Sequence, residues 1–209
     1  MNKIKISSIN IHGLRNRKKR ASFFKYIKRS SYDIVCVQES FITNEIKDVW
    51  EKEWGGTLFY SAGTPNSMGQ MILVKKKFSF DTVLIHQSNR ILTIKIKTES
   101  NDLLVSNIYA PTVQKEKQPF FRELSNHLHS LDSHCILVCG DFNCVVDNEF
   151  DIIQGNKHYR KDVECFNNFI TDSELNDVWR LFNPGKKEYT WSRNNPFIAR
   201  RLDYIFATE

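Results

Sequence analysis

Apolar and polar residues recur along the chain with two periods, which predict strands and helices in turn. Residues 3–9 alternate between polar and apolar side chains, as a half-buried strand does. Residues 33–38 form a compact apolar run that predicts a buried strand. Between the two, Phe23, Phe24 and Ile27 share one face of a helix predicted over residues 21–29.

The rest of the chain continues this alternation. Residues 44–53 predict a helix with Thr43 as its N-cap and with Ile46, Val49 and Trp50 facing inward. Helices are also predicted over residues 119–131 and 162–171, and strands over 58–61, 71–74, 80–86, 91–97, 103–109, 135–139, 188–192 and 201–206. Clustered strands interrupted by a few helices predict an α/β (α+β) fold, a four-layer sandwich of two packed mixed β-sheets flanked by helices.

Length and composition indicate a single domain over residues 1–209. The chain has 209 residues, 41% of them hydrophobic, which suffices for one well-buried domain. Its apolar runs are too short to span a bilayer, and its N-terminus lacks the apolar core of a signal peptide. We therefore expect an intracellular protein without a membrane partner.

Charge and cysteine content add little to this picture. The net charge of +6 fits a polyanionic partner, although solubility alone would also account for it. Cys36, Cys135 and Cys139 lie in apolar runs, which predicts reduced, buried thiols. Cys135, Cys139 and Cys144 cluster in sequence but lack the paired spacing of a structural zinc site, so we expect none.

Polar residues that end the predicted strands carry the chemical information. Each one alone is typical of a turn or a helix cap. Together they supply the oxygen ligands that Mg²⁺ prefers, and groups able to orient water and bind a phosphate. The set comprises three carboxylates, two amides and a phenol: Glu39, Asp141, Asp203, Asn10, Asn143 and Tyr109.

Six sequence motifs in a fixed order make the pattern specific. They are Asn10-Ile11-His12-Gly13-Leu14, Gln38-Glu39, Tyr109-Ala110-Pro111, Gly140-Asp141-Phe142-Asn143, Tyr189-Thr190-Trp191 and Arg201-Leu202-Asp203-Tyr204-Ile205. This series resembles the endonuclease/exonuclease/phosphatase superfamily, in the form carried by non-LTR retrotransposons. The resemblance spans residues 4–206 and implies a Mg²⁺-dependent hydrolase that nicks double-stranded target DNA.

The resemblance also implies roles for individual residues. Glu39 would be the main Mg²⁺ ligand, with Asn10 beside it and with Mn²⁺ as an alternative ion. Asp141 would align or deprotonate the attacking water. Four further residues would act on the phosphate: Asn143 and Tyr109 as hydrogen-bond donors, Thr190 by lining the site, and Asp203 by orienting a histidine.

Two departures from the family pattern stand out. Abasic-site repair enzymes of the superfamily carry Asp at the position of His12, which we expect to be an exposed loop residue here. The family also ends with a Ser-Asp-His motif beyond the strand of Asp203, whereas this chain stops at Glu209. The sequence therefore predicts a site that lacks this histidine, a loss that typically costs about 10²–10³ in rate.

Basic residues follow the Asn10 loop directly, at Arg15, Arg17, Lys18, Lys19 and Arg20. All five are candidates for binding phosphates, with Arg17, Lys18 and Lys19 the foremost, and the alternative is a solvated helix start or a nuclear-import-like patch. Weaker candidates are Lys157, Arg160, Lys161, Arg193, Arg200 and Arg201.

Three functions fit these observations. The first is the retrotransposon endonuclease, acting in the nucleus and continuous with a reverse transcriptase in the full-length element. The second is a phosphatase of the same superfamily that acts on a phosphoinositide or phospholipid headgroup. The third is a catalytically dead remnant that binds nucleic acid. The high basic content favours DNA over a lipid headgroup.

Overall fold

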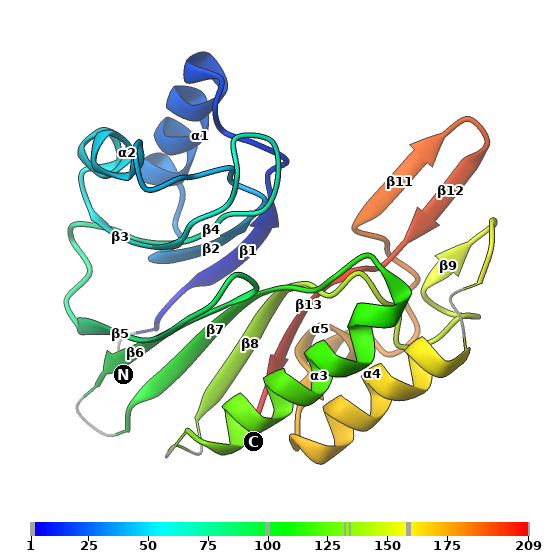
Figure 1. The fold of residues 1–209 in the computed structure, drawn as a ribbon. Helices are drawn as coiled ribbons and strands as arrows, with labels where there is room; N and C mark the ends of the chain where they lie inside the picture. The colour runs from blue at the N-terminus through cyan, green and yellow to red at the C-terminus, as the bar shows by residue number, and fades with distance from the viewer. Residues whose placement is uncertain (1–2, 99–100, 132, 134, 158–159, 209) are drawn as a thin grey trace. The chain divides into compact units, whose positions relative to one another are not determined.

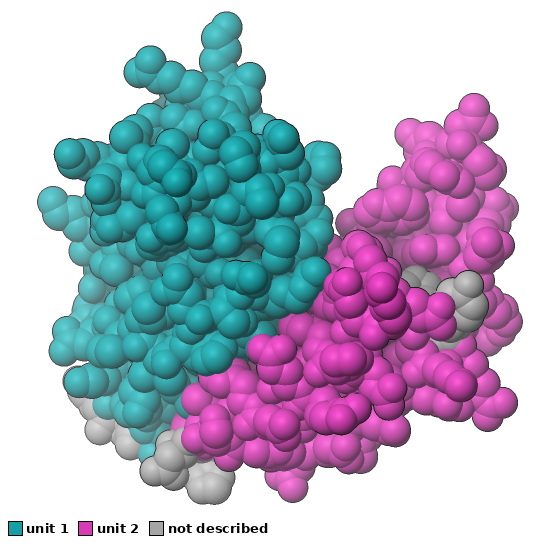
Figure 2. Space-filling view, viewed as in Figure 1, with its two compact units in different colours: residues 1–109 teal, residues 110–209 magenta. Residues whose placement is uncertain are grey.

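The computed structural model describes residues 3–98, 101–131, 133, 135–157 and 160–208. The chain divides into two compact units, residues 1–109 and residues 110–209, coloured teal and magenta in Figure 2. Each unit combines β-sheet with helices, which confirms the predicted α/β class (Figure 1). No helix in the described part of the chain is both long enough and apolar enough to cross a membrane.

Unit 1 contains two sheets and two helices. Its elements are β1 (Ile6–Asn10), α1 (Arg17–Arg29), β2 (Ile34–Gln38), α2 (Lys47–Trp54), β3 (Thr57–Ser61), β4 (Gln70–Val74), β5 (Asp81–Gln87), β6 (Ile91–Lys97) and β7 (Leu103–Tyr109). One sheet has the order β1-β2-β4-β3, with β1 and β2 parallel and the other neighbours antiparallel. The antiparallel strands β5, β6 and β7 form a second sheet that packs against the first.

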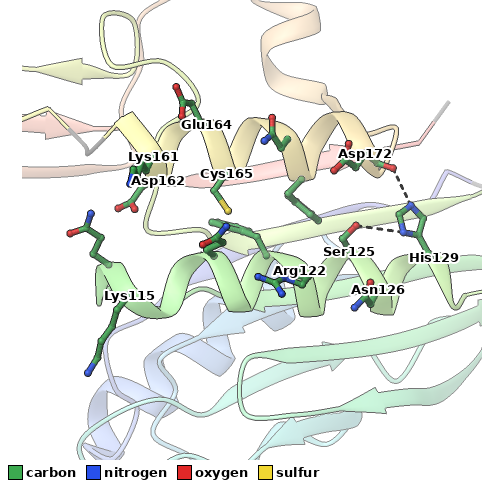
Figure 3. Close-up of a pocket in the computed structure, with 15 residues that line it drawn as sticks. Lys115, Arg122, Ser125, Asn126, His129, Lys161, Asp162, Glu164, Cys165 and Asp172 are labelled. Carbon is green, nitrogen blue, oxygen red and sulfur yellow. Dashed lines mark hydrogen bonds between the residues drawn. The ribbon is translucent and has the colours of Figure 1, made fainter.

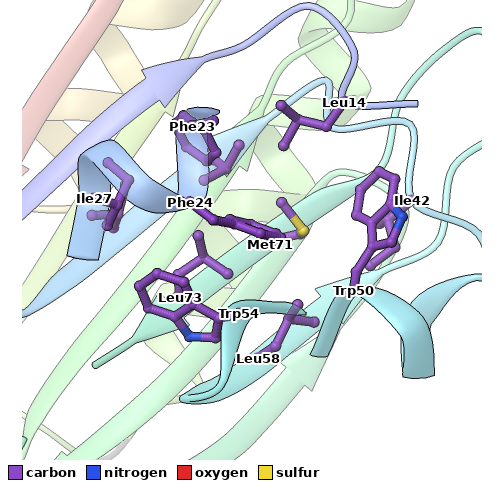
Figure 4. Packing of buried hydrophobic residues seen from close by; sticks show 12 residues of the cluster. Leu14, Phe23, Phe24, Ile27, Ile42, Trp50, Trp54, Leu58, Met71 and Leu73 are labelled. Carbon is purple, nitrogen blue, oxygen red and sulfur yellow. The ribbon is translucent and has the colours of Figure 1, made fainter. Parts of the chain in front are cut away.

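Helices α1 and α2 cover the outer face of the four-stranded sheet and complete its core (Figures 1 and 4). Phe24 and Ile27 of α1 and Trp50 and Trp54 of α2 are each 2% exposed and pack in one cluster with residues of β2, β3 and β4. Burial of each such side chain contributes roughly 1.5–3 kcal/mol. Trp54 also donates its indole N–H to the carbonyl of Val74, at 3.1 Å.

Unit 2 contains a small sheet, a hairpin and three helices. Its elements are α3 (Gln114–His129), β8 (Ile136–Asp141), β9 (Ile152–Ile153), α4 (Arg160–Asp172), β10 (Asn176–Asp177), α5 (Val178–Phe182), β11 (Trp191–Asn194), β12 (Phe197–Arg200) and β13 (Asp203–Ala207). Strand β13 pairs antiparallel with both β8 and β10, whereas β12 pairs with β11 and β9. Helices α3 and α4 pack through stacked rings, with Phe166 centred 5.0 Å from Phe121 and 5.2 Å from Phe142.

The second helix begins later than predicted. Residues 44–46 form a turn in which the carbonyl of Thr43 accepts hydrogen bonds from the amides of Ile46 and Lys47. Ile46 therefore occupies the N-cap position, without a side-chain cap, and the predicted role of Thr43 as N-cap is wrong. The prediction that Val49 faces inward is also wrong, because Val49 is 53% exposed and Trp54 fills the core instead.

Other boundaries differ by a few residues. Helix α3 starts at Gln114 rather than at Pro119, since the polar residues before the proline are good helix formers. The strand predicted over residues 188–192 is realised as β11, which forms a hairpin with the unpredicted β12. Cys36 and Cys139 are buried as expected. Cys144 is buried as well, and burial raises the pKa of its thiol to about 12. Cys135 is exposed, because β8 begins one residue later.

Candidate active site

Glu39 is the centre of a polar cluster in unit 1. It follows the last residue of β2 and adopts a left-handed backbone conformation, with φ of 51°. Its Oε1 accepts hydrogen bonds from the Tyr109 hydroxyl at 2.7 Å and from Asn10 Nδ2 at 3.0 Å. His12 Nδ1 lies 3.0 Å from Oε2. The structure therefore brings together Asn10, Glu39 and Tyr109, and it adds His12 to the group.

Strand pairing explains why these residues meet. Strands β1 and β2 run parallel with Asn10 opposite Gln38, so Asn10 reaches the residue that follows β2. Below them, the fully buried amide of Gln38 donates to Asn107 Oδ1 at 2.6 Å. Asn107 Nδ2 in turn donates to the carbonyls of Val37 and Met71, both at 3.1 Å. This amide network joins β7 to β2 and β4 directly beneath Glu39 and Tyr109.

The surroundings keep the Glu39 carboxyl ionised. Partial burial on its own raises the pKa of Glu39, but hydrogen bonds from Tyr109, Asn10 and His12 outweigh burial and lower the pKa below its ordinary value. Because the folded pKa is lowered, this contribution to stability is present above the unfolded pKa and is lost as the pH falls through the folded pKa. At neutral pH the cluster therefore presents a fixed negative charge.

The loop after β1 is fixed by backbone contacts. The Gly13 amide donates to the carbonyl of Glu39 at 2.6 Å. Gly13 has φ of +85°, and a Cβ there would lie 2.6 Å from the Phe41 ring, so a side chain is excluded. Lys19 Nζ donates to the carbonyls of Ile11 at 2.6 Å and His12 at 3.0 Å, which ties the start of α1 to this loop.

A second polar group lies in unit 2, at the end of β8. Asp141 is 7% exposed, and its Oδ1 accepts the Asn143 amide at 2.9 Å. Asn143 is held in a left-handed conformation, with φ of 47°, and its Nδ2 donates to the carbonyl of Ala110 at 2.9 Å. These contacts fold the residues after β8 into a tight turn with the Asp141 carboxylate on its inner side.

A buried ion pair supports this turn from below. Lys117 of α3 is 5% exposed and donates from Nζ to the carbonyl of Asn143 at 2.9 Å. The same Nζ lies 3.3 Å from Oδ2 of Asp162, which is 7% exposed on α4. A buried charge is tolerated only when it is paired and hydrogen-bonded, so this lysine has a structural task at the turn.

Asp203 and Thr190 belong to the same group in unit 2. Asp203 is the first residue of β13 and lies directly opposite Asp141 in the ladder. Thr190 Oγ1 accepts the amides of Leu202 at 3.0 Å and Asp203 at 3.1 Å. Thr190 therefore fixes the backbone on which the Asp203 carboxylate is carried.

Two of the basic candidates have other tasks. Arg201 is 4% exposed, with its guanidinium 2.9 Å from Asp151 and 2.7 Å from Asp177. Arg20 is 6% exposed and binds Glu53 in a two-pronged ion pair. Buried ion pairs of this kind leave no charge for a phosphate, so the prediction that these two arginines contact phosphate is wrong. Arg17, Lys18 and Lys19 are exposed, as phosphate binding requires.

The oxygen donors in unit 1 fit a hard cation better than a soft one. Among the residues that the structure describes, no group of three or more His, Cys, Asp or Glu is arranged to hold a metal ion. Mg²⁺ needs fewer protein ligands, because it keeps several waters and is commonly held by one or two carboxylates. Glu39 offers an ionised carboxylate. Asn10 lies beside it, but its Nδ2 faces Glu39 and its Oδ1 accepts the His12 amide at 3.1 Å, so the Asn10 oxygen would reach a shared ion only after the side-chain amide turns over.

A groove between α3 and α4 is a separate feature of unit 2 (Figure 3). Arg122, Ser125 and Cys165 lie along it, and at one end His129 bonds to the carbonyl of Asp172 at 3.0 Å. In the described part of the chain, its lining includes none of the six polar residues predicted for the reaction centre, nor Thr190, but it does include Lys161, one of the weaker phosphate-binding candidates. Asp162 reaches it from α4, beside its partner Lys117.

Comparison with known proteins identifies the family. Residues 7–209 match the Endonuclease/Exonuclease/phosphatase family, and the chain belongs to it. It is 26% identical over 208 residues to the Transposon TX1 uncharacterized 149 kDa protein of Xenopus laevis, covering 97% of this chain and 16% of that protein. It is 22% identical to the Exodeoxyribonuclease of Bacillus subtilis (strain 168), covering 99% of this chain and 88% of that enzyme.

Solved structures share the fold. The AP endonuclease LMAP of Leishmania major aligns with a TM-score of 0.81 at 16% identity, covering 99% of this chain and 79% of that chain. The endonuclease domain of TRAS1, a telomere-specific non-LTR retrotransposon, aligns with a TM-score of 0.71 at 13% identity, covering 99% and 86%. The transposon relative and the TRAS1 structure support the predicted likeness to retrotransposon endonucleases.

Proposed function

We propose that this protein is a Mg²⁺-dependent endonuclease domain that nicks duplex DNA, as in a non-LTR retrotransposon. The Glu39 cluster carries the proposal. An ionised, partly buried carboxylate that receives hydrogen bonds from Tyr109, Asn10 and His12 is typical of a functional site, where carboxyl groups with perturbed pKa values concentrate. Such a carboxylate would serve to hold a cation that acts on a phosphate.

In unit 1, Glu39 and Asn10 would hold the ion. Bound Mg²⁺ would neutralise charge on the phosphate and on the leaving oxygen. Tyr109 would donate a hydrogen bond to the same phosphate when substrate enters. The hydrogen bonds to Glu39 keep the carboxylate in one orientation, so that little reorganisation is needed at the moment of reaction.

In unit 2, Asp141 would align the attacking water and accept its proton. Asn143 donates one hydrogen of its side-chain amide to the carbonyl of Ala110. The second hydrogen of that amide would be donated to a phosphate oxygen. Thr190 holds the backbone of Asp203, and the Asp203 carboxylate would orient a neighbouring donor towards the phosphate. These roles follow from family membership, position by position.

The distribution of charge supports a polymeric substrate. Unit 1 has 18 basic and nine acidic residues, a net charge of +9, whereas unit 2 has 12 basic and 15 acidic residues, a net charge of −3. A single phosphorylated headgroup needs only a few cations, whereas duplex DNA presents two negative charges for each base pair. The excess of positive charge on unit 1 therefore favours DNA.

The function is tested by nicking of supercoiled plasmid in Mg²⁺ and in EDTA. We expect nicking in Mg²⁺ only, and a fall of about 10²–10³ in both Glu39→Gln and Asp141→Asn. Mg²⁺ titration separates the two variants, because only Glu39→Gln should weaken ion binding. Glu51→Gln, which removes a half-exposed carboxylate of the same unit, is the matched control and should nick at the normal rate.

Other outcomes would overturn the proposal. Release of phosphate from a phosphoinositide without plasmid nicking would assign the chain to the phosphatases of the family. Salt-sensitive DNA binding without any nicking would indicate a catalytically dead remnant. Equal nicking by the wild type and Glu39→Gln would remove the Glu39 cluster from the reaction.

We further propose that the domain works within a longer retrotransposon protein that also carries a reverse transcriptase. The chain spans 16% of the length of the Transposon TX1 protein that it matches. Sequencing of full-length transcripts tests this proposal. A reading frame that encodes this domain without any polymerase in every transcript would contradict it.

A further inference from the structure

Helix α1 carries an unusual concentration of positive charge. Its 13 residues include seven basic side chains and no acidic one: Arg17, Lys18, Lys19, Arg20, Lys25, Lys28 and Arg29. They account for seven of the 18 basic residues in unit 1. Arg20 points into the protein and pairs with Glu53, and Lys19 is bound to the carbonyls of the loop after β1. The others are exposed.

Three of these residues form a straight line on the outer face of the helix. With 3.6 residues per turn, Lys18, Lys25 and Arg29 fall within about 40° of one another, opposite the buried Phe24 and Ile27. At 1.5 Å per residue the line is roughly 17 Å long. We call Lys18, Lys25 and Arg29 the basic ridge. Figure 1 shows α1 on the outside of unit 1, and all three residues of the ridge are exposed.

The ridge is unfavourable for the isolated helix. Like charges four residues apart, as at Lys25 and Arg29, cost about 0.2–0.5 kcal/mol. Lys18 lies in the first turn, where the helix dipole disfavours a cation. Acidic residues on the same face would relieve both costs, yet α1 has none. A polyanion lying along the helix would relieve them instead.

The ridge begins beside the candidate site. Lys19, next to Lys18, is hydrogen-bonded to Ile11 and His12, and the His12 ring contacts Glu39. The start of α1 therefore lies close to Glu39, and DNA whose cleaved phosphate lay at Glu39 would have this helix beside it. A line of roughly 17 Å matches about five base pairs of duplex DNA at 3.4 Å each.

We propose that the basic ridge binds the phosphate backbone of the duplex DNA that flanks the phosphodiester cut at the Glu39 site. This inference rests on the proposed endonuclease function. The inference adds that the protein contacts the DNA along α1, away from the reaction centre. Contacts of this kind position the DNA without reading its sequence. The ridge should therefore strengthen binding equally for every sequence.

The test measures binding of a 30-base-pair duplex to Glu39→Gln protein, which should leave the DNA intact, over a range of salt concentrations. The ridge variant is Lys18→Ala/Lys25→Ala/Arg29→Ala. The control variant, Lys52→Ala/Lys76→Ala/Lys77→Ala, removes the same charge from exposed positions of the same unit. Each phosphate contact contributes about 0.9 to the slope of log K against log salt, so the ridge variant should lose up to about 3 units and the control almost none.

Further arms distinguish the occupant. Single-stranded RNA and vesicles of anionic lipid serve as other polyanions. Equal slopes for the ridge and control variants, or an effect confined to RNA or vesicles, would overturn the proposal. In a separate assay, plasmid nicking is measured with protein that retains Glu39. Absence of nicking there would show that the endonuclease function has failed, whatever the result for the ridge.

Discussion

The two units hold their polar residues by different physical means. In unit 1, Glu39 is fixed by three side chains from two separate segments, residues 10–12 and Tyr109, which hydrogen-bond directly to its carboxylate. In unit 2, the Asp141 turn is fixed mainly through the backbone, by Lys117 on the carbonyl of Asn143 and by Asn143 on that of Ala110. The first arrangement sets the charge of one group, and the second sets the shape of a loop.

Both arrangements stabilise the same local conformation. Glu39 and Asn143 each lie just beyond a strand and adopt positive φ, which is sparsely populated for residues other than glycine. Such a conformation costs of order 1–3 kcal/mol, and it persists only where several surrounding contacts hold it in place. Unit 1 meets that cost with hydrogen bonds from neutral donors to the ionised Glu39 carboxylate, whereas unit 2 uses a buried ion pair. The two should therefore fail differently when a supporting residue is removed.

The largest expected effect is in unit 2. Lys117→Met leaves the Asp162 carboxylate buried without its partner, and breaking a buried pair typically costs about 3–5 kcal/mol of unfolding free energy. Urea denaturation measures the loss. Lys115→Met, at an exposed position of the same helix, should change stability by less than about 0.5 kcal/mol.

A double variant separates stability from positioning. Lys117→Met/Asp162→Leu removes both charges, so it should regain most of the stability that Lys117→Met loses. The Asn143 carbonyl still lacks its donor, so plasmid nicking should stay low at equal folded concentration. Normal nicking by the double variant would show that the ion pair supports the fold but not the turn.

A smaller effect is expected from the amide network of unit 1. Asn107→Leu removes the donor to Val37 and Met71 and the acceptor of Gln38, and it should cost about 1–3 kcal/mol of unfolding free energy. Nicking should fall by roughly 10–100-fold, which is typical when a residue that orients a metal ligand is lost. Asn101→Leu, at an exposed position before β7, is the control. Full nicking by folded Asn107→Leu would show that Tyr109 reaches Glu39 without this network.

Much of this architecture follows from local sequence. The buried strands β2 and β6 were predicted to within a residue, because a run of apolar residues fixes a buried strand strongly. Asn10 and Tyr109, which contact Glu39 in unit 1, lie at the ends of their strands, and the same apolar pattern sets where those strands end. The late start of α2 was not predictable, because the turn over residues 44–46 depends on backbone hydrogen bonds rather than on residue type.

Supporting residues were missed for two different reasons. Asn107 gave a signal, since an amide inside the apolar run of β7 must find buried partners. Lys117 gave none: it lies between Glu116 and Gln118 in a polar stretch, and only the packing of α3 on α4 distinguishes it from Lys115. Arg20 and Arg201 were misassigned for the same reason, because their carboxylate partners lie 24 to 50 positions away in sequence.

Removal of the Tyr109 hydroxyl should change how nicking depends on pH. Tyr109→Phe removes a hydrogen bond that lowers the pKa of Glu39, so that pKa should rise. Nicking requires the ionised carboxylate, which exists above the pKa, and the acidic limb of the pH–rate profile should therefore move to higher pH. The rate at neutral pH should fall by roughly tenfold. Tyr60→Phe removes an exposed hydroxyl of the same unit, and its profile should match that of the wild type. An unshifted acidic limb in Tyr109→Phe would mean that Asn10 and His12 alone hold the charge.

The smallest effect is expected at His12. Its ring nitrogen lies 3.0 Å from Glu39, but its side chain is 87% exposed, whereas that of Glu39 is 18% exposed. Exposed ion pairs contribute about 0–1 kcal/mol, so His12→Ala should slow nicking by less than about fivefold. Salt screens such a pair, and the difference between His12→Ala and the wild type should shrink further as ionic strength rises. His12→Asn, which keeps a hydrogen-bonding side chain without the ring, should nick at least as well as His12→Ala. A loss of a hundredfold or more in both variants would instead make His12 a residue that acts on the substrate, and the cluster in unit 1 would then contribute to the reaction as well as to ion binding.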